Sequence, residues 1–287
     1  MRFLSPLRYP GGKRKIAEFM KDTIVQNEMI GGTYVEPFVG GASVALFLLL
    51  NSYVDKIIIN DIDRSIYAFW FCVINETDRL CNKIRETEVT VDEWKKQKDL
   101  QNSKETADLF DLAFSTFFLN RTNRSGVLNG GMIGGKNQVG KWKIDARYNK
   151  EKLIRRIERI ASYKNNIYIY CEDSIKFINN ISETIDDKTL IYFDPPYYNK
   201  GSTLYVNHFT HQDHRKLAEF IQNLDCKWVL TYDYTPEIIE MYKNTKMKKL
   251  YLDYTAATRI KGVEMLAFSN TLLVPTEHYT NIKIESV

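Results

Sequence analysis

The chain contains little cysteine and little histidine, four residues of each among 287. The cysteines are scattered without a C-x-x-C pair, a pattern typical of buried free thiols in a reducing compartment rather than of a disulfide framework. His208, His211 and His214 recur at three-residue spacing. Thr210 and Asp213 overlap them as a capping box that opens a helix, so we expect a helix start there and no metal.

Long apolar segments are absent as well. The longest uninterrupted apolar run, residues 44–50, is far shorter than the roughly 20 residues that cross a bilayer. Residues 1–6 contain no apolar core of signal-peptide length, and no stretch is repeated or low in complexity. We therefore expect a cytoplasmic globular protein, built as one large α/β domain or as one domain that carries an insertion.

The net charge of +4 is too small to identify a partner, but the basic residues are concentrated in one segment. Between residues 119 and 164, twelve bases stand against three acids. Such a local excess can neutralise phosphates and predicts a polyanionic partner, although a solvated basic surface is the alternative. The bases are Arg121, Arg124, Lys136, Lys141, Lys143, Arg147, Lys150, Lys152, Arg155, Arg156, Arg159 and Lys164.

Short apolar runs that end in acidic or glycine-rich turns alternate with amphipathic stretches, which is the pattern of an open α/β sheet. From residue 64 to about 163 this alternation gives way to predicted helices, a glycine-rich loop and a basic helix. We divide the chain into a discontinuous domain, residues 1–63 and 164–287, and an inserted helical domain, residues 64–163. The expected strands are 33–36, 56–60, 167–170, 189–193 and 227–231, and the expected helices of the insertion lie near 65–75, 91–101 and 105–119 and after about 149.

Two segments have the spacing of a nucleotide-type cofactor site. Residues 34–42 (YVEPFVGGA) predict a strand, a turn with two glycines and an apolar helix, and glycine allows a ligand close to the backbone. About twenty residues later another apolar strand ends before Asp61 and Asp63. A carboxylate at this position accepts hydrogen bonds from ribose hydroxyls, and we expect Asp61 in that role and Asp63 as a helix cap. Each segment alone also fits an ordinary strand-to-helix turn.

A third segment, residues 190–198 (LIYFDPPYY), ends an apolar strand with Asp194, two prolines and Tyr197. The amino group of adenine is a poor nucleophile because its lone pair is delocalised into the ring. A carboxylate and a rigid carbonyl that accept its two N–H bonds favour a geometry in which the lone pair meets an electrophile. The tyrosine offers a flat surface to a base rotated out of a duplex. The structural alternative is a strand that simply ends in a turn.

Asp194-Pro195-Pro196-Tyr197, preceded by residues 36–41 (EPFVGG) and 8–13 (RYPGGK), resembles the Dam-type, D12-class, alpha-ordered DNA adenine-N6 methyltransferases over nearly the whole chain. The resemblance implies a Rossmann-like S-adenosylmethionine-dependent sheet with an inserted target-recognition domain. It also implies site-specific methylation of adenine N6 in double-stranded DNA by base flipping and direct in-line attack. A role in restriction-modification, with a cognate restriction endonuclease as a further partner, belongs to the same expectation.

The resemblance also implies the roles of individual residues, in three groups. Asp194 and Pro195 bind the target amine, and Tyr197 stacks on the target base. Asn and Arg side chains of the insertion contact base edges while lysines contact phosphates, and a segment from Arg259 packs beside the target base. The cofactor residues are Tyr9, Pro10, Gly11, Gly12, Lys13, Glu36, Phe38, Gly40, Asp61, Asp173 and Asp194, and the DNA-binding residues are Asn120, Arg121, Asn123, Arg124, Lys136, Asn137, Lys141 and Arg259.

Three questions remain open from the sequence. Residues 134–142 (GGKNQVGKW) differ from the recognition hairpin of GATC-specific members, so the resemblance leaves the target sequence open. The same site geometry suits N4 of cytosine and other conjugated nitrogens. A DNA-binding homologue whose methyltransferase site has decayed is a third alternative, although Asp61 and Asp194 are both present.

Overall fold

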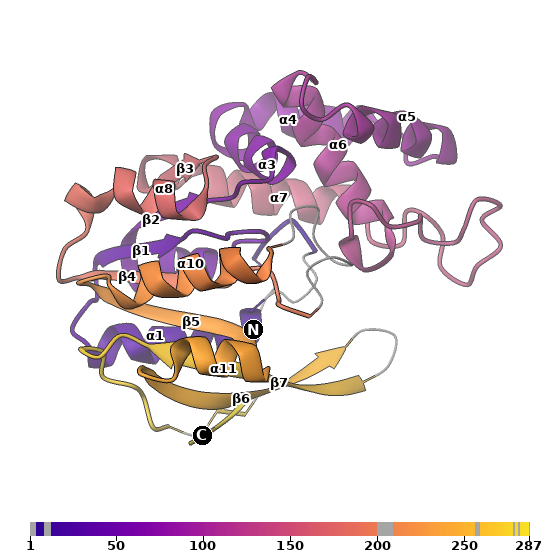
Figure 1. Cartoon of the computed structure of the whole chain (residues 1–287). Coiled ribbons are helices and arrows are strands. Elements are labelled where there is room, and N and C mark those ends of the chain that lie inside the picture. The colour runs from indigo at the N-terminus through magenta and orange to yellow at the C-terminus, as the bar shows by residue number, and fades with distance from the viewer. Residues whose placement is uncertain are drawn as a thin grey trace. The chain divides into compact units, whose positions relative to one another are not determined.

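The structure is a computed structural model that describes residues 4–8, 13–199, 209–255, 259–277, 279–280 and 282–286 (Figure 1). The chain forms two compact units. Unit 1 consists of Met1–Gly12 and Asp61–Cys171, and unit 2 consists of Lys13–Asn60 and Glu172–Val287. Within the described ranges, no helix is both long enough and apolar enough to cross a membrane.

The strands of unit 2 form a mixed sheet in the order β2-β1-β4-β5-β7-β6-β8. β1 (Gly32–Glu36), β2 (Val54–Asn60), β4 (Thr189–Phe193) and β5 (Lys227–Asp233) run parallel, and β6 (Lys246–Thr255), β7 (Arg259–Phe268) and β8 (Ile282–Ser286) pair antiparallel. Parallel strands covered on both sides are apolar throughout, and all five residues of β4 are buried. The predicted α/β class with a Rossmann-like sheet is confirmed.

The strand order identifies the edge of the sheet where a ligand would bind. β1 lies between β2 and β4, so the chain leaves β1 on one side and returns to it on the other. Open α/β sheets bind ligands at the carboxyl ends of strands beside such a reversal. β1 ends at Glu36, and Asp194 follows the last residue of β4. The topology therefore brings these two acids to the same edge.

The helices of unit 2 are α1 (Ala17–Gln26), α2 (Ser43–Leu50), α8 (Ser174–Asn180), α10 (His211–Gln222) and α11 (Pro236–Tyr242), with short 3-10 turns at Arg14–Ile16 and Ser182–Thr184. α2 is buried from Val44 to Leu50, as expected of a helix that is apolar all round. At the start of α10, Thr210 and Asp213 exchange the reciprocal hydrogen bonds of a capping box. The predicted start of this helix is confirmed.

Unit 1 is mostly helical, as predicted for the insertion (Figure 1). Its most buried element is α6, where the Phe117 ring stacks on Phe69 of α3, with centroids 6.1 Å apart, and contacts Tyr148 edge-on. α6 begins later than expected because Asp108 caps it by accepting hydrogen bonds from the amides of Phe110 and Asp111. The elements are α3 (Arg64–Asn75), α4 (Thr77–Glu86), α5 (Val91–Asn102), α6 (Leu109–Thr122), α7 (Lys150–Ala161) and β3 (Ile167–Tyr170), with 3-10 turns at Arg124–Gly126 and Lys164–Asn166.

The cysteines only partly match the expected buried thiols. All four are free, and Cys72 and Cys81 are buried on α3 and α4. Cys226 is half-buried, and Cys171 is exposed, which corrects the prediction for that residue. The reason is positional, because Cys171 lies one residue beyond the end of β3 rather than within the strand.

A buried asparagine bonds the N-terminal segment of unit 1 on both sides of its backbone. Asn120 on α6 accepts a hydrogen bond from the Arg8 amide (2.7 Å) and donates to the Arg8 and Gly126 carbonyl oxygens (2.8 and 2.9 Å). Gly126 has a φ of +79°, and a Cβ added to it would lie 2.1 Å from the Arg8 oxygen. Only glycine satisfies both conditions at this position.

Replacing Gly126 with alanine should destabilise unit 1. The positive φ alone costs about 1–3 kcal/mol for a residue with a side chain, and the overlap with the Arg8 carbonyl adds to it. Urea unfolding of the whole chain measures the loss. Gly131→Ala is the matched control, because a Cβ there meets nothing within 4 Å. Equal stability of the two variants would contradict the close approach of Arg8 to Gly126.

Candidate active site

Asp194 lies directly after β4, at the carboxyl edge of the unit 2 sheet. Its side chain is 23% exposed, so the carboxylate sits among buried residues but still reaches the surface. Burial raises the pKa of Asp194, the Lys13 ammonium lowers it and the Glu264 carboxylate raises it. The charge of this acid therefore depends on its immediate neighbours.

Lys13 connects Asp194 to two further side chains. It is 5% exposed, and its Nζ lies 2.7 Å from Asp194 Oδ1, 3.0 Å from the Tyr197 hydroxyl and 3.6 Å from Glu264 Oε1. The Tyr197 hydroxyl donates a short hydrogen bond to Glu264, which is buried on β7. One lysine thus bridges two carboxylates and contacts the phenol of the ring predicted to stack on the target base.

A second hydrogen bond reaches the same oxygen of Asp194 from β5. Thr231 Oγ1 lies 2.9 Å from Asp194 Oδ1, and the Tyr192 hydroxyl lies 2.7 Å from Thr231 Oγ1. A threonine hydroxyl has one proton. Because that proton is directed at Asp194, the Tyr192 hydroxyl must be the donor to Thr231. The chain of donors ends on the carboxylate and stabilises its charged form.

Glu36, at the end of β1, is 4% exposed and belongs to the same edge of the sheet. The Tyr34 hydroxyl donates to its Oε1 at 3.0 Å. Burial raises the pKa of Glu36 to about 8, the bond from Tyr34 opposes this, and the nearby Asp194 charge reinforces it. Glu36 is consequently a buried acid that a cation would help to ionise.

The turn after β1 is fixed by a buried asparagine. Asn60, the last residue of β2, donates to the carbonyl oxygens of Pro37 (3.0 Å) and Glu172 (2.9 Å) and accepts from the Glu172 amide (2.9 Å). Beyond the turn, Gly40 has a φ of +43°, where a side chain would be strained. Phe38 is half-buried, with its ring edge against Phe209 at 6.1 Å between centroids.

The turn after Asp194 is held by another acid. The backbone amides of Tyr198 and Asn199 donate to the two carboxylate oxygens of Asp233, at 2.9 and 3.0 Å. Pro195 is buried at the start of this turn, and Tyr197 is half-buried. Asp233 ends β5, so the strand beside β4 anchors the Asp-Pro-Pro-Tyr segment.

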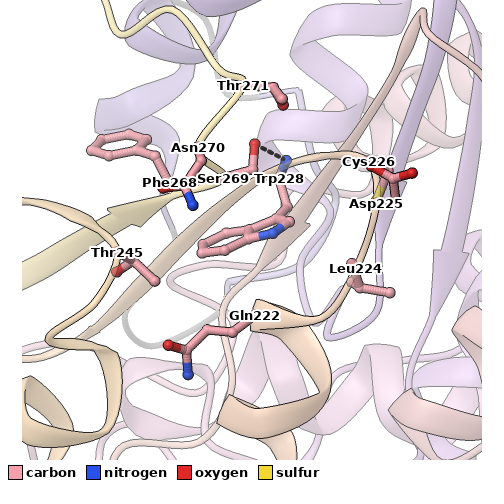
Figure 2. Close-up of a pocket in the computed structure, with 10 residues that line it drawn as sticks. All are labelled: Gln222, Leu224, Asp225, Cys226, Trp228, Thr245, Phe268, Ser269, Asn270 and Thr271. Carbon is pink, nitrogen blue, oxygen red and sulfur yellow. Dashed lines mark hydrogen bonds between the residues drawn. The ribbon is translucent and has the colours of Figure 1, made fainter.

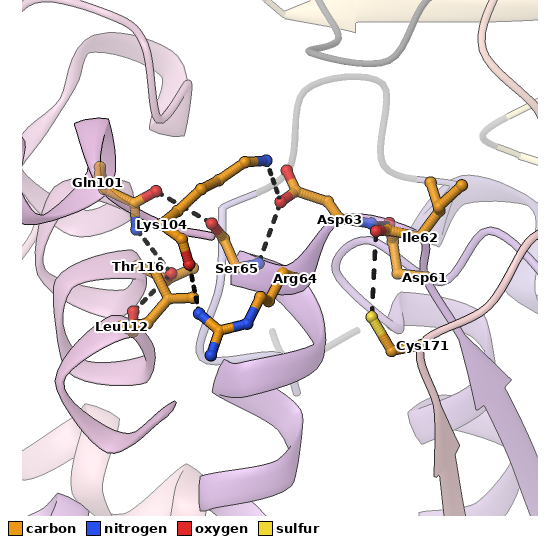
Figure 3. A network of polar contacts seen from close by, with 10 residues as sticks. All are labelled: Asp61, Ile62, Asp63, Arg64, Ser65, Gln101, Lys104, Leu112, Thr116 and Cys171. Carbon is orange, nitrogen blue, oxygen red and sulfur yellow. Dashed lines mark hydrogen bonds and ion pairs between the residues drawn. The ribbon is translucent and has the colours of Figure 1, made fainter. Parts of the chain in front are cut away.

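Asp61 and Asp63 belong to unit 1 (Figure 3). Asp63 accepts from the Ser65 amide and caps α3, which confirms its predicted role, and it pairs with Lys104 at 2.8 Å. Asp61 accepts a hydrogen bond from the Asp63 amide at 3.0 Å and is half-buried. The cap and its ion pair fix the segment that presents Asp61, whose ribose role remains a prediction.

Asp173 is a further predicted cofactor residue that the structure describes. Asp173 is exposed and caps α8 by accepting from the amides of Ile175 and Lys176. Arg259 begins β7, and its side chain is outside the description. Outside the described residues lie His208, Tyr9, Pro10, Gly11 and Gly12.

Two of the predicted DNA-binding residues point inward. Asn120 is 1% exposed and holds Arg8 and Gly126 as described above. Asn123 has no exposed surface; it accepts from the Trp94 indole (2.6 Å) and donates to the carbonyl oxygens of Val127 and Leu128. Both amides are used in shaping the loop that follows α6.

The remaining predicted DNA-binding residues are on the surface of that loop. Arg124, Lys136, Asn137 and Lys141 are exposed. The loop is organised by Gln138, whose side-chain amide donates to the carbonyl oxygens of Ile133 and Gly135 and whose oxygen accepts from the Ile144 amide. Trp142 and Val139 project from it with 57% and 85% of their surface exposed. Lys141 and Arg147 lie within 6 Å of the Trp142 ring.

A cluster of arginines lies beside this loop in unit 1. Arg121 donates to the Arg147 carbonyl oxygen from Nε at 2.7 Å, and Arg8 donates to the Asn123 carbonyl oxygen at 3.2 Å. Burial, together with the charges of Arg8, Arg156 and Arg147, lowers the pKa of Arg121 to about 9. These arginines are held by backbone oxygens and repel one another, so a polyanion would stabilise the cluster.

A pocket of about 200 Å³ lies at the opposite end of β5, between the start of this strand and the end of β7 (Figure 2). Trp228, Phe268 and Ser269 line it together with the exposed Asp225. It contains none of the predicted site residues. Among the residues with described side chains, no group of three or more His, Cys, Asp or Glu side chains could hold a metal ion.

Sequence reasoning missed three residues of the Asp194 cluster and its surroundings. The sequence could have indicated Asn60, because it is a polar residue at the end of an apolar strand. It indicated Glu264 less clearly, as a single acid within the apolar half of a strand. No sequence feature indicated Thr231, since only the pairing of β4 with β5 brings its hydroxyl to Asp194.

Comparisons with known proteins agree on one family. The family model described as D12 class N6 adenine-specific DNA methyltransferase matches residues 9–266. The Type II methyltransferase M.MjaIII of Methanocaldococcus jannaschii is 27% identical over 85% of this chain and 89% of its own length. A DNA adenine methylase of Escherichia coli K12 is 26% identical over 76% of this chain and 75% of its own. The Type II methyltransferase M1.LlaDCHI of Lactococcus lactis is 24% identical over 96% of this chain and 95% of its own.

Glu36 should make the stability of the folded chain depend on pH. Its folded pKa of about 8 lies above the value of 4.5 expected when unfolded, so its contribution is complete below pH 4.5 and is lost as the pH rises towards 8. Over that window the free energy of unfolding should fall by about 1.4 kcal/mol per pH unit relative to Glu36→Gln, which keeps an acceptor for Tyr34. Urea unfolding at pH 5, 6, 7 and 8 measures the difference, and parallel curves for the two proteins would contradict a protonated Glu36.

Proposed function

Because the chain belongs to the D12 class of N6 adenine-specific DNA methyltransferases, we propose that it methylates adenine N6 in duplex DNA with Asp194 at the reacting amine and S-adenosylmethionine as the donor. The observation that carries the assignment of Asp194 is its position. It is a partly exposed carboxylate at the carboxyl edge of a parallel sheet, next to the strand that ends at Glu36. Two prolines and an aromatic ring follow it directly.

In this proposal Asp194 accepts a hydrogen bond from the target amine and orients its lone pair out of the plane of the base. The carboxylate is also placed to take up the proton that the nitrogen loses on methylation. The Tyr197 ring, whose hydroxyl is held by Lys13 and Glu264, gives the base a fixed surface for stacking. Alignment of this kind accounts for several kcal/mol of a reaction barrier.

The cofactor residues of unit 2 have the chemistry that S-adenosylmethionine requires. Glu36 is a buried carboxylate that gains from a neighbouring cation, such as the ammonium group of the methionine part. Gly40 offers backbone without a Cβ, and Phe38 offers a half-buried ring to the adenine part. When bound, the cofactor supplies a methyl group on a positively charged sulfur. Asp61 and Asp173 remain the proposed contacts to its ribose and adenine.

Duplex DNA is the proposed partner of unit 1. The support is the exposed basic loop with Arg124, Lys136 and Lys141, together with the arginine cluster beside it. Exposed Trp142 adds an aromatic surface between two cations, a combination that suits stacked bases next to phosphates. Asn120 and Asn123 enter this proposal as the residues that hold the loop, since their amides are bonded within it.

The biological setting is proposed from the relatives. Two of those described above are named Type II methyltransferases, a name that supports a role in restriction-modification. We propose a cognate restriction endonuclease as the functional counterpart and the cytoplasm, where host DNA is accessible, as the location.

Asp194→Asn should abolish most of the methyl transfer. The amide retains the size of the side chain but removes the charge and one acceptor, and losses of this kind reduce kcat by about 10²–10³-fold. The measurement is transfer of label from S-adenosylmethionine to duplex DNA, followed by digestion to nucleosides to identify N6-methyladenine.

Asp225→Asn, in the pocket at the other end of β5, is the matched control and should transfer methyl groups at the wild-type rate. A wild-type rate for Asp194→Asn would remove Asp194 from the reaction. Label recovered as N4-methylcytosine would replace the proposed substrate.

Removing Lys136 and Lys141 together should weaken DNA binding in a salt-dependent way. If each lysine contacts one phosphate, the slope of log K against log salt should fall by about 2 in magnitude, because each contact contributes about 0.9. Fluorescence anisotropy with a labelled duplex at several salt concentrations measures it. The control is Lys95→Ala with Lys243→Ala, two exposed lysines already paired with Asp92 and Glu240. Equal slopes for both double variants would exclude the loop from the DNA interface.

A further inference from the structure

We propose that Lys13 is a positioning residue for methyl transfer: with Thr231 it holds Oδ1 of Asp194 and leaves Oδ2 to accept from the target amine, while Glu264 and Tyr197 hold Lys13 in place. This inference rests on the proposed function. It gives Lys13 a role at the reacting group, in addition to the cofactor contact that the family resemblance implies.

The hydrogen bonds on Asp194 are directed to one oxygen only. Lys13 Nζ at 2.7 Å and Thr231 Oγ1 at 2.9 Å both donate to Oδ1. Within the described part of the chain, no side chain or backbone group donates to Oδ2, although the carboxyl group is 23% exposed. Two donors from different elements, the segment before α1 and β5, fix the plane of the carboxylate. The second oxygen is thereby oriented before any substrate arrives.

Lys13 is held from the other side by β7 and by the turn after β4. Glu264 Oε1 lies 3.6 Å from its Nζ, and the Tyr197 hydroxyl, itself bonded to Glu264, lies at 3.0 Å. All four groups are at least partly buried, so their interactions are weakly screened by water. Glu264 therefore fixes two things at once, the ammonium that faces Asp194 and the ring beside it.

The charges make Lys13 decisive for the state of Asp194. Among the described residues, the Lys13 ammonium is the cation that lowers the pKa of Asp194, whereas burial and the Glu264 charge raise it. Loss of this ammonium would raise the pKa of Asp194 further and favour the protonated form, in which an oxygen donates where the amine requires an acceptor. The titratable groups around Asp194 are Lys13, Glu36, Tyr34, Tyr192, Tyr197, Tyr232 and Glu264.

Substitutions of Lys13 and Glu264 should therefore shift the pH profile of methyl transfer in opposite directions. In Lys13→Met, the acid limb of kcat/KM should move up by roughly one pH unit, as expected when a single adjacent opposite charge is removed. In Glu264→Gln, it should move down, because a like charge is lost and Lys13 remains beside Asp194. A role limited to folding would lower the rate in both variants without moving the limb.

The experiment compares the pH profiles of wild type, Lys13→Met and Glu264→Gln on duplex DNA with saturating S-adenosylmethionine. A titration of Asp194 by NMR, using carboxyl-labelled aspartate and the Asp194→Asn spectrum for assignment, gives a readout independent of activity. Lys13→Arg restores the charge and should return the limb towards wild type. Lys13→Gln replaces Lys13→Met if thermal melting shows that the latter does not fold.

Opposite shifts in both readouts support the positioning role. If wild type methylates adenine and neither variant moves the acid limb or the Asp194 titration, the role of Lys13 is overturned and the proposed function stands. If wild type does not methylate adenine, the proposed function fails, and the NMR titration alone decides whether Lys13 sets the charge of Asp194.

Discussion

The site depends on keeping one carboxylate charged at the edge of a buried sheet. Removing an ionised carboxyl group from water costs several kcal/mol unless partners compensate. In this chain the compensation for Asp194 comes from the Lys13 ammonium and the Thr231 hydroxyl, which lie 181 and 37 residues from Asp194 in the sequence and meet at one of its oxygens. The sheet order makes the meeting possible, because the pairing of β4 with β5 brings Thr231 to Asp194, and Lys13 reaches the same oxygen from the segment before α1.

Two acids lie at neighbouring strand ends, the charge of Asp194 raises the pKa of Glu36, and the two carboxyl groups have different partners. Asp194 has a lysine within 3 Å, whereas Glu36 has a tyrosine hydroxyl and a pKa of about 8. Asp194 is therefore paired with a lysine of the chain, whereas Glu36 favours its protonated form. A cationic cofactor placed near Glu36 would ionise it by displacing a proton rather than by breaking an ion pair. In the proposed function, that difference would keep Asp194 paired with Lys13 while the cofactor is exchanged.

Much of the fold could be predicted from the sequence, because apolar runs that end in Glu36, Asn60 and Phe193 are sharply bounded by polar or glycine-rich turns. β6, β7 and β8 were not predicted, since charged residues interrupt the apolar pattern of these strands at the antiparallel side of the sheet. The Asp-Pro-Pro-Tyr segment led to Asp194, whose position at the carboxyl edge of the sheet agrees with a predicted role at the reacting amine. Its partners could not be predicted from spacing, because Glu264 reaches Tyr197 only through the pairing of β7 with β5.

The asparagines after α6 show why residue type alone does not separate recognition from folding. Asn120 and Asn123 have the amide groups that read base edges, and both amides are bonded to backbone and indole groups within unit 1. A buried amide whose donors and acceptor are satisfied would lose those bonds on turning to DNA. In the proposed function, sequence-specific contacts would therefore come from exposed groups on the same loop, such as Asn137 and Arg124. The buried asparagines would then affect recognition indirectly, because they hold the loop that presents these side chains.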